Sequence, residues 1–119
     1  MSATPPTAAE AAEAAQAQLE AYNAQDVERF AACYAEDVEA FELPLGTLLF
    51  RGREVLRARY AKLFAANPRL HCRLTARIVE GDFVIDQEEL SGRADGGSGR
   101  AVAIYQVERG LIRRVWFAR

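Results

Sequence analysis

Hydrophobic positions in the first part of the chain recur every three or four residues, the spacing of one face of a helix. A run rich in alanine extends from the capping-box sequence Thr7-Ala8-Ala9-Glu10 to about Tyr22. Its small side chains favour close packing of the helix against a sheet. Asp26 occupies the position of an N-cap for a second, short helix, and a third helix is predicted over about residues 54–66.

After the second helix the hydrophobic period changes to two, as in a strand. The first predicted strand places Glu42 on the same side as Val38 and Ala40 and ends near Pro44. A second begins at about His71 and puts Cys72, Leu74, Ala76 and Ile78 on one side, with Arg73, Thr75 and Arg77 on the other. The remaining strands are predicted over residues 83–91, 100–108 and 111–118, with hairpin turns at Gly81-Asp82 and Arg109-Gly110.

The predicted order is helix, helix, strand, helix and then four antiparallel strands. A strongly bent, mostly antiparallel sheet wrapped around a long helix would bury the apolar faces of all these elements. The sequence therefore predicts an α+β fold in which three N-terminal helices pack on the sheet. We expect residues 1–119 to form one domain and residues 1–7 to be a flexible tail.

Composition narrows the classes of function. The 119 residues are half apolar, and their longest apolar runs are too short to cross a bilayer. The chain start lacks the pattern of a secretory signal, so we expect a cytoplasmic protein. Residues 1–50 carry nine acids against Arg29 alone, and residues 51–119 carry 14 bases against eight acids. These bases are spread over a helix and several strands, which argues against a nucleic-acid-binding face.

Few residues are suited to metal or redox chemistry. Cys33 and Cys72 are not spaced as a metal or thiol-redox motif, so free buried thiols are expected. His71 is the only histidine, and it shares strand parity with Arg73, which favours the outer face or rim. We therefore expect neither a metal nor a cofactor.

Several short motifs resemble the SnoaL-like and ketosteroid-isomerase-like branch of the NTF2-like superfamily. They are Tyr22-Asn23-Ala24-Gln25-Asp26, Cys33-Tyr34-Ala35-Glu36-Asp37-Val38, Phe50-Arg51-Gly52-Arg53-Glu54, Tyr105-Gln106-Val107-Glu108-Arg109-Gly110-Leu111-Ile112 and Val115-Trp116-Phe117. The resemblance covers about residues 10–119. It implies a cone-shaped fold, a pocket for a small apolar ligand between sheet and helices, and a homodimer formed through the outer face of the sheet.

The resemblance also suggests a catalytic set. The general base of the isomerases corresponds to Glu42, and their two oxyanion donors correspond to Gln18 and to Ala103 or its neighbour. Neither donor is retained, although the Tyr105 hydroxyl would lie near the place left by Ala103. The chain is thus expected to carry out cofactor-free isomerisation or a related proton transfer, with Glu42 as base and Tyr105 or Gln18 as polar partner.

Other candidates remain open at this stage. Tyr22, Tyr60, His71, Asp86 and Trp116 are further candidates for ligand contact, and Trp116 could belong instead to a dimer face. Asp86 and Glu88 share one strand face; if it points inward, Asp86 could pair with His71 or Glu42, and if outward, both acids could pair with Arg73 and Arg77. The alternative function is a binding module that holds a small hydrophobic ligand without turnover.

Overall fold

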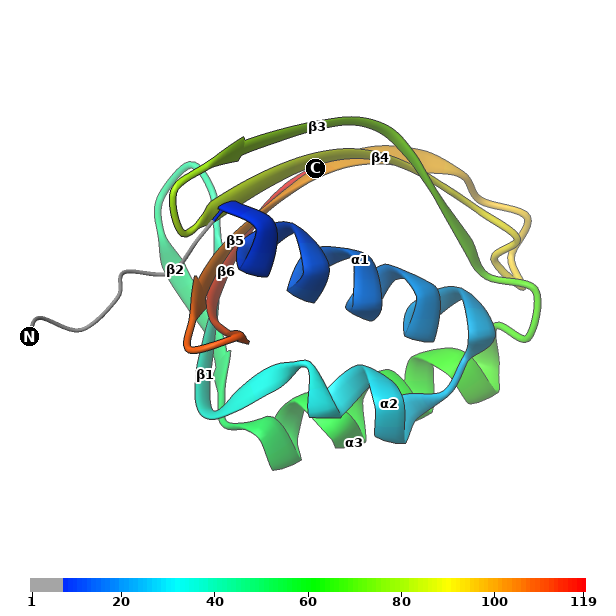
Figure 1. Ribbon diagram of the computed structural model, residues 1–119. Coiled ribbons are helices and arrows are strands. Elements are labelled where there is room, and N and C mark those ends of the chain that lie inside the picture. Colours follow the sequence, from blue (N-terminus) through cyan, green and yellow to red (C-terminus); the bar gives the residue numbers. More distant parts are fainter. Residues whose placement is uncertain (1–7) are drawn as a thin grey trace, which may run out of the picture.

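The computed structural model describes residues 8–119, in which helices cover one face of a curved sheet (Figure 1). The residues of the expected tail, including Thr7 of the capping box, lie outside this range. The elements are α1 (Ala8–Ala24), α2 (Val27–Ala32), β1 (Tyr34–Glu42), β2 (Thr47–Arg51), α3 (Arg53–Ala66), β3 (His71–Glu80), β4 (Phe83–Ser91), β5 (Gly99–Glu108) and β6 (Leu111–Ala118).

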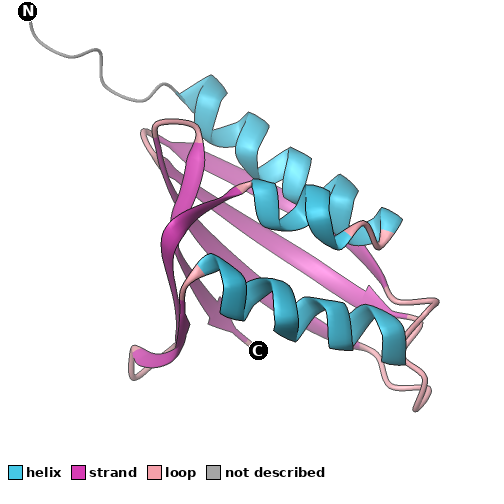
Figure 2. Ribbon diagram, turned by 90° about the horizontal axis from the view of Figure 1, so that it is seen from below, coloured by secondary structure: helices cyan, strands magenta, loops and turns pink. Residues whose placement is uncertain are grey.

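The six strands form one sheet in the order β2-β1-β6-β5-β4-β3. Only β1 and β6 pair in parallel, and the other neighbours are antiparallel. All three helices lie on the same side of the sheet (Figure 2), where α1 packs against β3, β4, β5 and β6 and α3 packs against β1 and β2. The prediction of an α+β fold with helices on a bent, mostly antiparallel sheet is confirmed.

Helix α1 packs closely on the sheet because its inward face consists largely of alanine. Ala11 and Ala15 are completely buried, and Gln18 is the one polar side chain buried on this helix. Near the helix end, the Asn23 side chain donates to the Cys72 carbonyl oxygen at 2.9 Å and accepts from the Cys72 N–H at 2.8 Å. These two bonds fix the end of α1 against the start of β3.

The Asp26 cap and the two predicted hairpin turns are confirmed. Asp26 caps α2 by accepting a hydrogen bond from the Arg29 N–H at 3.1 Å. Gly81, Arg109 and Gly110 have positive φ, as tight two-residue hairpin turns require. The strand β2 was not predicted from the sequence. It is a short edge strand that pairs with β1 alone, so it lacks the long alternating pattern of a central strand.

A bulge in β3 overturns the predicted alternation of that strand. The register with β4 shifts between Leu74 and Ala76, so that Thr75 is the extra residue. Beyond the bulge the two faces exchange: Ile78 becomes 61% exposed, and Arg77 turns to the inner face. The prediction that Ile78 shares a face with Cys72 is therefore wrong. The same register shift places the Arg77 guanidinium on the inner face of the sheet.

Candidate functional site

A pocket of about 380 Å³ lies between α1, α3 and the inner face of the sheet. This volume falls within the range of small-molecule sites, roughly 300–1,000 Å³. Its wall is made by Gln18, Leu19, Tyr22, Phe30, Tyr34, Leu49, Phe50, Arg59, Tyr60, Lys62, Leu63, Leu70, Cys72, Glu88, Leu90, Arg93, Ala101, Tyr105, Phe117 and Arg119. Apolar and aromatic groups thus surround a few polar ones.

A cluster of aromatic rings positions the tyrosines on the helical side of the pocket. Phe30 of α2 is buried, and its ring centroid lies 4.5 Å from that of Tyr60 and 5.0 Å from that of Tyr34. Tyr22 packs edge-on against Phe64 at 5.3 Å. Because rings in such contacts have little freedom, the orientations of these hydroxyls are set before any ligand enters.

Three tyrosine hydroxyls are available to a ligand. The Tyr34 hydroxyl donates to the Gln18 side-chain carbonyl at 3.4 Å. Those of Tyr22, Tyr60 and Tyr105 have no hydrogen-bond partner within the described residues. Burial raises the pKa of Tyr60 to about 12 and also raises the pKa values of Tyr22 and Tyr105. All three phenols are therefore neutral donors at physiological pH.

Glu88 is the only acid that residues 8–119 place on the pocket wall. Its side chain comes from the inner face of β4, where it pairs with Leu74 and Ala101 across the sheet, and the residue is 8% exposed. The pKa of Glu88 is raised to about 7, mainly by desolvation of the carboxylate and to a smaller extent by the negative charge of Asp86. A carboxyl with this pKa exchanges a proton readily near neutrality, which is what general acid–base catalysis needs.

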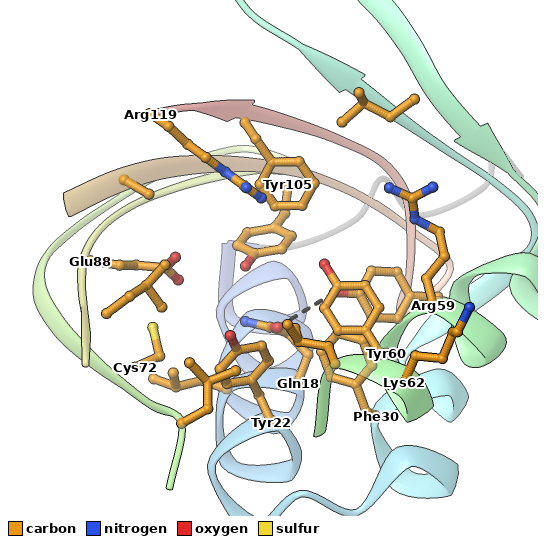
Figure 3. A pocket seen from close by; sticks show the side chains of 18 of the residues that line it. Gln18, Tyr22, Phe30, Arg59, Tyr60, Lys62, Cys72, Glu88, Tyr105 and Arg119 are labelled. Carbon is orange, nitrogen blue, oxygen red and sulfur yellow. Dashed lines mark hydrogen bonds between the residues drawn. The ribbon is translucent and has the colours of Figure 1, made fainter. Parts of the chain in front are cut away.

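Figure 3 shows how these groups converge: the Glu88 carboxyl and the hydroxyls of Tyr22, Tyr60 and Tyr105 point into the same space from different elements. Cys72 of β3 lies beside Glu88 (Figure 3). Burial and the nearby Glu88 raise the pKa of the Cys72 thiol, so it is protonated and unsuited to nucleophilic attack.

Asp86 forms a buried ion pair next to this acid. The residue has no solvent exposure, and its two carboxylate oxygens accept from the Arg77 Nε at 2.7 Å and the Arg77 Nη2 at 2.9 Å. Gln16 of α1 accepts from the third guanidinium nitrogen at 3.0 Å. The strand face that sequence reasoning left open thus points inward, yet Asp86 pairs with Arg77 and with neither His71 nor Glu42.

The structure brings four of the expected site residues together at the pocket: Gln18, Tyr22, Tyr60 and Tyr105. Gln18 is largely committed to the fold, because its amide nitrogen donates to the Ala15 carbonyl at 3.0 Å and its oxygen accepts from Tyr34. Tyr105 is 3% exposed and lies one pleat from Ala103 on the inner face of β5. This is the placement that the sequence analysis expected for its hydroxyl.

Glu42 lies outside the pocket, and its predicted inward orientation is wrong. Val38 and Ala40 are fully buried, as the alternation predicts, but burial along β1 ends there. Glu42 is the last residue of β1 and is exposed, and its carbonyl accepts from the Gly46 N–H in the following turn. The reason for proposing Glu42 as the base, its position inside the pocket, is therefore absent.

His71 and Trp116 also lie outside the pocket. His71 is exposed and lines a separate, shallow groove with Arg73 and Glu89. Trp116 lies next to Phe117 on the opposite face of β6 and stacks on Phe41, with ring centroids 5.7 Å apart. The homodimer through this outer face stays a prediction.

Comparison with known proteins identifies the family. The family model for the SnoaL-like domain matches residues 15–115, which is most of the chain. The chain belongs to the SnoaL-like domain family. A search of curated proteins found no match. The predicted resemblance to the SnoaL-like branch of the NTF2-like superfamily is therefore confirmed.

Solved structures of several SnoaL-like or related folds superpose on the chain. An uncharacterised cystatin-fold protein from Novosphingobium aromaticivorans is 29% identical, with a TM-score of 0.82 over 92% of this chain and 97% of that one. A candidate ketosteroid isomerase from Kribbella flavida is 21% identical, with a TM-score of 0.77 over 92% and 76% of the two chains. An epoxide hydrolase of the LEH-like type from M. tuberculosis is 14% identical, with a TM-score of 0.80 over 92% and 82%.

Within residues 8–119, none of the helices is long and apolar enough to cross a membrane. That part of the chain also brings together no group of three or more His, Cys, Asp or Glu side chains suited to a metal ion. Cytoplasmic location stays a prediction.

Proposed function

We propose that this SnoaL-like protein is a cofactor-free acid–base enzyme that moves a proton on a small carbonyl compound, with Glu88 as the catalytic carboxyl. The observation that carries the proposal is the position of Glu88: a buried acid with a pKa of about 7 on the wall of a pocket lined largely by aromatic and apolar side chains. Perturbed acids in a ligand-sized cleft are characteristic of functional sites.

The arrangement supplies both halves of a proton transfer. The ionised Glu88 carboxylate would take the proton from the carbon beside the carbonyl. The electron pair of that C–H bond would form a C=C bond, and the π pair of the carbonyl would move onto its oxygen, which gives an enolate. The Tyr105 and Tyr60 hydroxyls would donate to this oxygen as its charge develops. Return of the proton from Glu88 to a different carbon completes an isomerisation without any other reactant.

Deuterium exchange tests this chemistry without knowledge of the natural substrate. The protein is incubated in D₂O with a panel of β,γ-unsaturated and saturated cyclic ketones, and loss of the α-proton signals is followed by NMR. We expect the rate to rise with pH up to about 7 and then to level off, because the base must be ionised. Glu88→Gln should lower the rate by roughly 10²–10⁴-fold.

Glu89→Gln is the matched control, since Glu89 is the next residue on β4 but lies off the pocket wall, is 42% exposed at its side chain and pairs with Arg73 at 2.8 Å. It should leave exchange unchanged. Equal rates for wild type and Glu88→Gln would contradict the proposal. Binding of the ketones without exchange by the wild type would favour the alternative, a module that holds a small ligand.

A further inference from the structure

Four basic side chains stand around the pocket. Arg59 and Lys62 come from α3, Arg93 from the loop after β4, and Arg119 follows β6. All four are exposed residues that nevertheless line the cavity wall. Arg59 and Lys62 reach it from the helical side, and Arg119 reaches it from the sheet side (Figure 3). We call these four residues the basic rim.

The basic rim is not neutralised by acids of the protein. None of its members has an ion-pair partner within residues 8–119, whereas the exposed Arg51 and Arg73 each pair with a glutamate. Among the described residues, the only acid on the wall is Glu88, which is buried and whose pKa Arg119 lowers. No acid forms an ion pair with the four cations, although the chain as a whole has a net charge of −2.

Aromatic wall residues hold two of the guanidinium groups in place. The Arg59 guanidinium carbon lies 4.8 Å from the centre of the Phe50 ring, and that of Arg119 lies 5.4 Å from the centre of the Phe117 ring. Stacking of this kind leaves the edge of the guanidinium, with its N–H donors, free to bind an anion. A cleft of one charge sign also concentrates ligands of the opposite sign.

We propose that the ligand of this pocket is a small organic acid, whose apolar body enters the tyrosine-lined interior while its carboxylate stays at the mouth against the basic rim. This inference adds a substrate class to the proposed function. It rests on that function for one feature, which is the carbonyl group on the buried part of the ligand. A carboxylate suits the rim because guanidinium groups bind it through paired, charge-assisted hydrogen bonds.

Matched pairs of acid and amide test this inference by binding alone. Cyclohexylacetate and phenylpropanoate are compared with their uncharged amides by calorimetric titration at low salt. We expect each acid to bind the wild type about tenfold or more tightly than its amide. The preference should decrease as salt is added, because the rim is exposed.

Two rim variants identify the cations responsible. Arg59→Gln/Lys62→Gln and Arg93→Gln/Arg119→Gln should each weaken acid binding by roughly fivefold or more and leave amide binding unchanged. Arg29→Gln/Arg69→Gln is the matched control: both residues are exposed and lie off the pocket wall, and the net charge changes equally. It should keep the preference within about twofold.

Several results would overturn the inference: equal binding of acid and amide, equal weakening of both ligands by the rim variants, the same loss in the control, or no acid binding up to about 5 mM. These outcomes are separate from those of the exchange experiment. If the protein prefers acids but exchanges no ketone protons, the proposed catalysis is wrong and the organic-acid ligand stands. If it exchanges the protons of neutral ketones but shows no preference for acids, the organic-acid ligand is wrong and the proposed catalysis stands.

Discussion

Glu88→Gln is expected to stabilise the protein at about pH 8 by roughly 2–3 kcal/mol, and to change its stability by no more than about 0.5 kcal/mol at pH 4.5. The cause is the desolvation of the carboxylate, with a further contribution from Asp86. A neutral amide of the same shape avoids the cost of burying this charge. The measurement is urea unfolding of both proteins at the two pH values.

The sign follows from the direction of the pKa shift. Glu88 has a pKa of about 7 in the folded state against 4.5 for an unperturbed glutamate. Below the lower value both states hold the proton, and the carboxyl behaves like the amide. Between the two values the unfolded chain releases the proton first, so wild-type stability falls as pH rises, and the loss is complete above the folded pKa.

The groups around Glu88 come from helices as well as strands: Tyr22 from α1, Tyr60 from α3, Cys72 and Arg77 from β3, Asp86 from β4, Tyr105 from β5 and Arg119 after β6. Asp86 raises the pKa of Glu88, while Cys72, Arg77 and Arg119 lower it. The control is Glu89→Gln. Because Arg73 lowers the pKa of Glu89, loss of the Glu89 carboxylate should lower the stability at pH 8, whereas loss of the Glu88 carboxylate should raise it. A Glu88→Gln effect of the same size at both pH values would contradict this account.

Arg77→Met is expected to destabilise the protein by about 3–5 kcal/mol. Asp86 has no solvent exposure, and only 17% of the Arg77 side chain is exposed. Removal of the guanidinium would leave a buried carboxylate without a counter-charge or its two short hydrogen bonds. Urea unfolding near pH 7 measures the loss.

The double variant Arg77→Met/Asp86→Leu separates the charge effect from a general packing defect. It removes both ions, so it should recover most of the stability that the single variant loses. Arg73→Met is the matched control on the same strand, where the exposed pair with Glu89 should contribute little. If Arg77→Met cost no more than Arg73→Met, the buried pair would not have the importance given to it here.

Local signals in the sequence predicted the elements well. The alanine-rich face, the Asp26 cap and the Gly81-Asp82 and Arg109-Gly110 turns depend on residues close together in the chain, and each produced the expected structure. The tyrosines of the pocket were also foreseen, because Tyr22 and Tyr60 lie on the apolar faces of their helices.

The predicted orientation of side chains was wrong in two places: where β3 departs from strict alternation and at the end of β1. The bulge at Thr75 reverses the faces of β3, and nothing in the local sequence distinguishes it from a regular strand. Glu42 has the correct parity, but parity does not show that burial stops at Ala40. The sheet covers a residue only if a neighbouring element extends beyond it, and that is a property of the assembled fold.

Glu88 was overlooked as a catalytic candidate because the inward face of its strand was not decided. One signal could have decided it: Val84, Asp86, Glu88 and Leu90 share parity, and both ends of this row are apolar. The partners on β5 agree, since Asp86 and Glu88 lie opposite the small residues Ala103 and Ala101. Two acids facing an alanine row are more easily accommodated than two acids facing bulky side chains.

The most direct test of this account is a titration of Glu88 itself. The carboxyl carbon signals of the glutamates are followed by NMR from acid to alkaline pH, and the signal of Glu88 is assigned by its absence in Glu88→Gln. Burial on the pocket wall should give a midpoint of about 7. A midpoint near 4.5, the pKa of an unperturbed glutamate, would contradict the proposed role of Glu88.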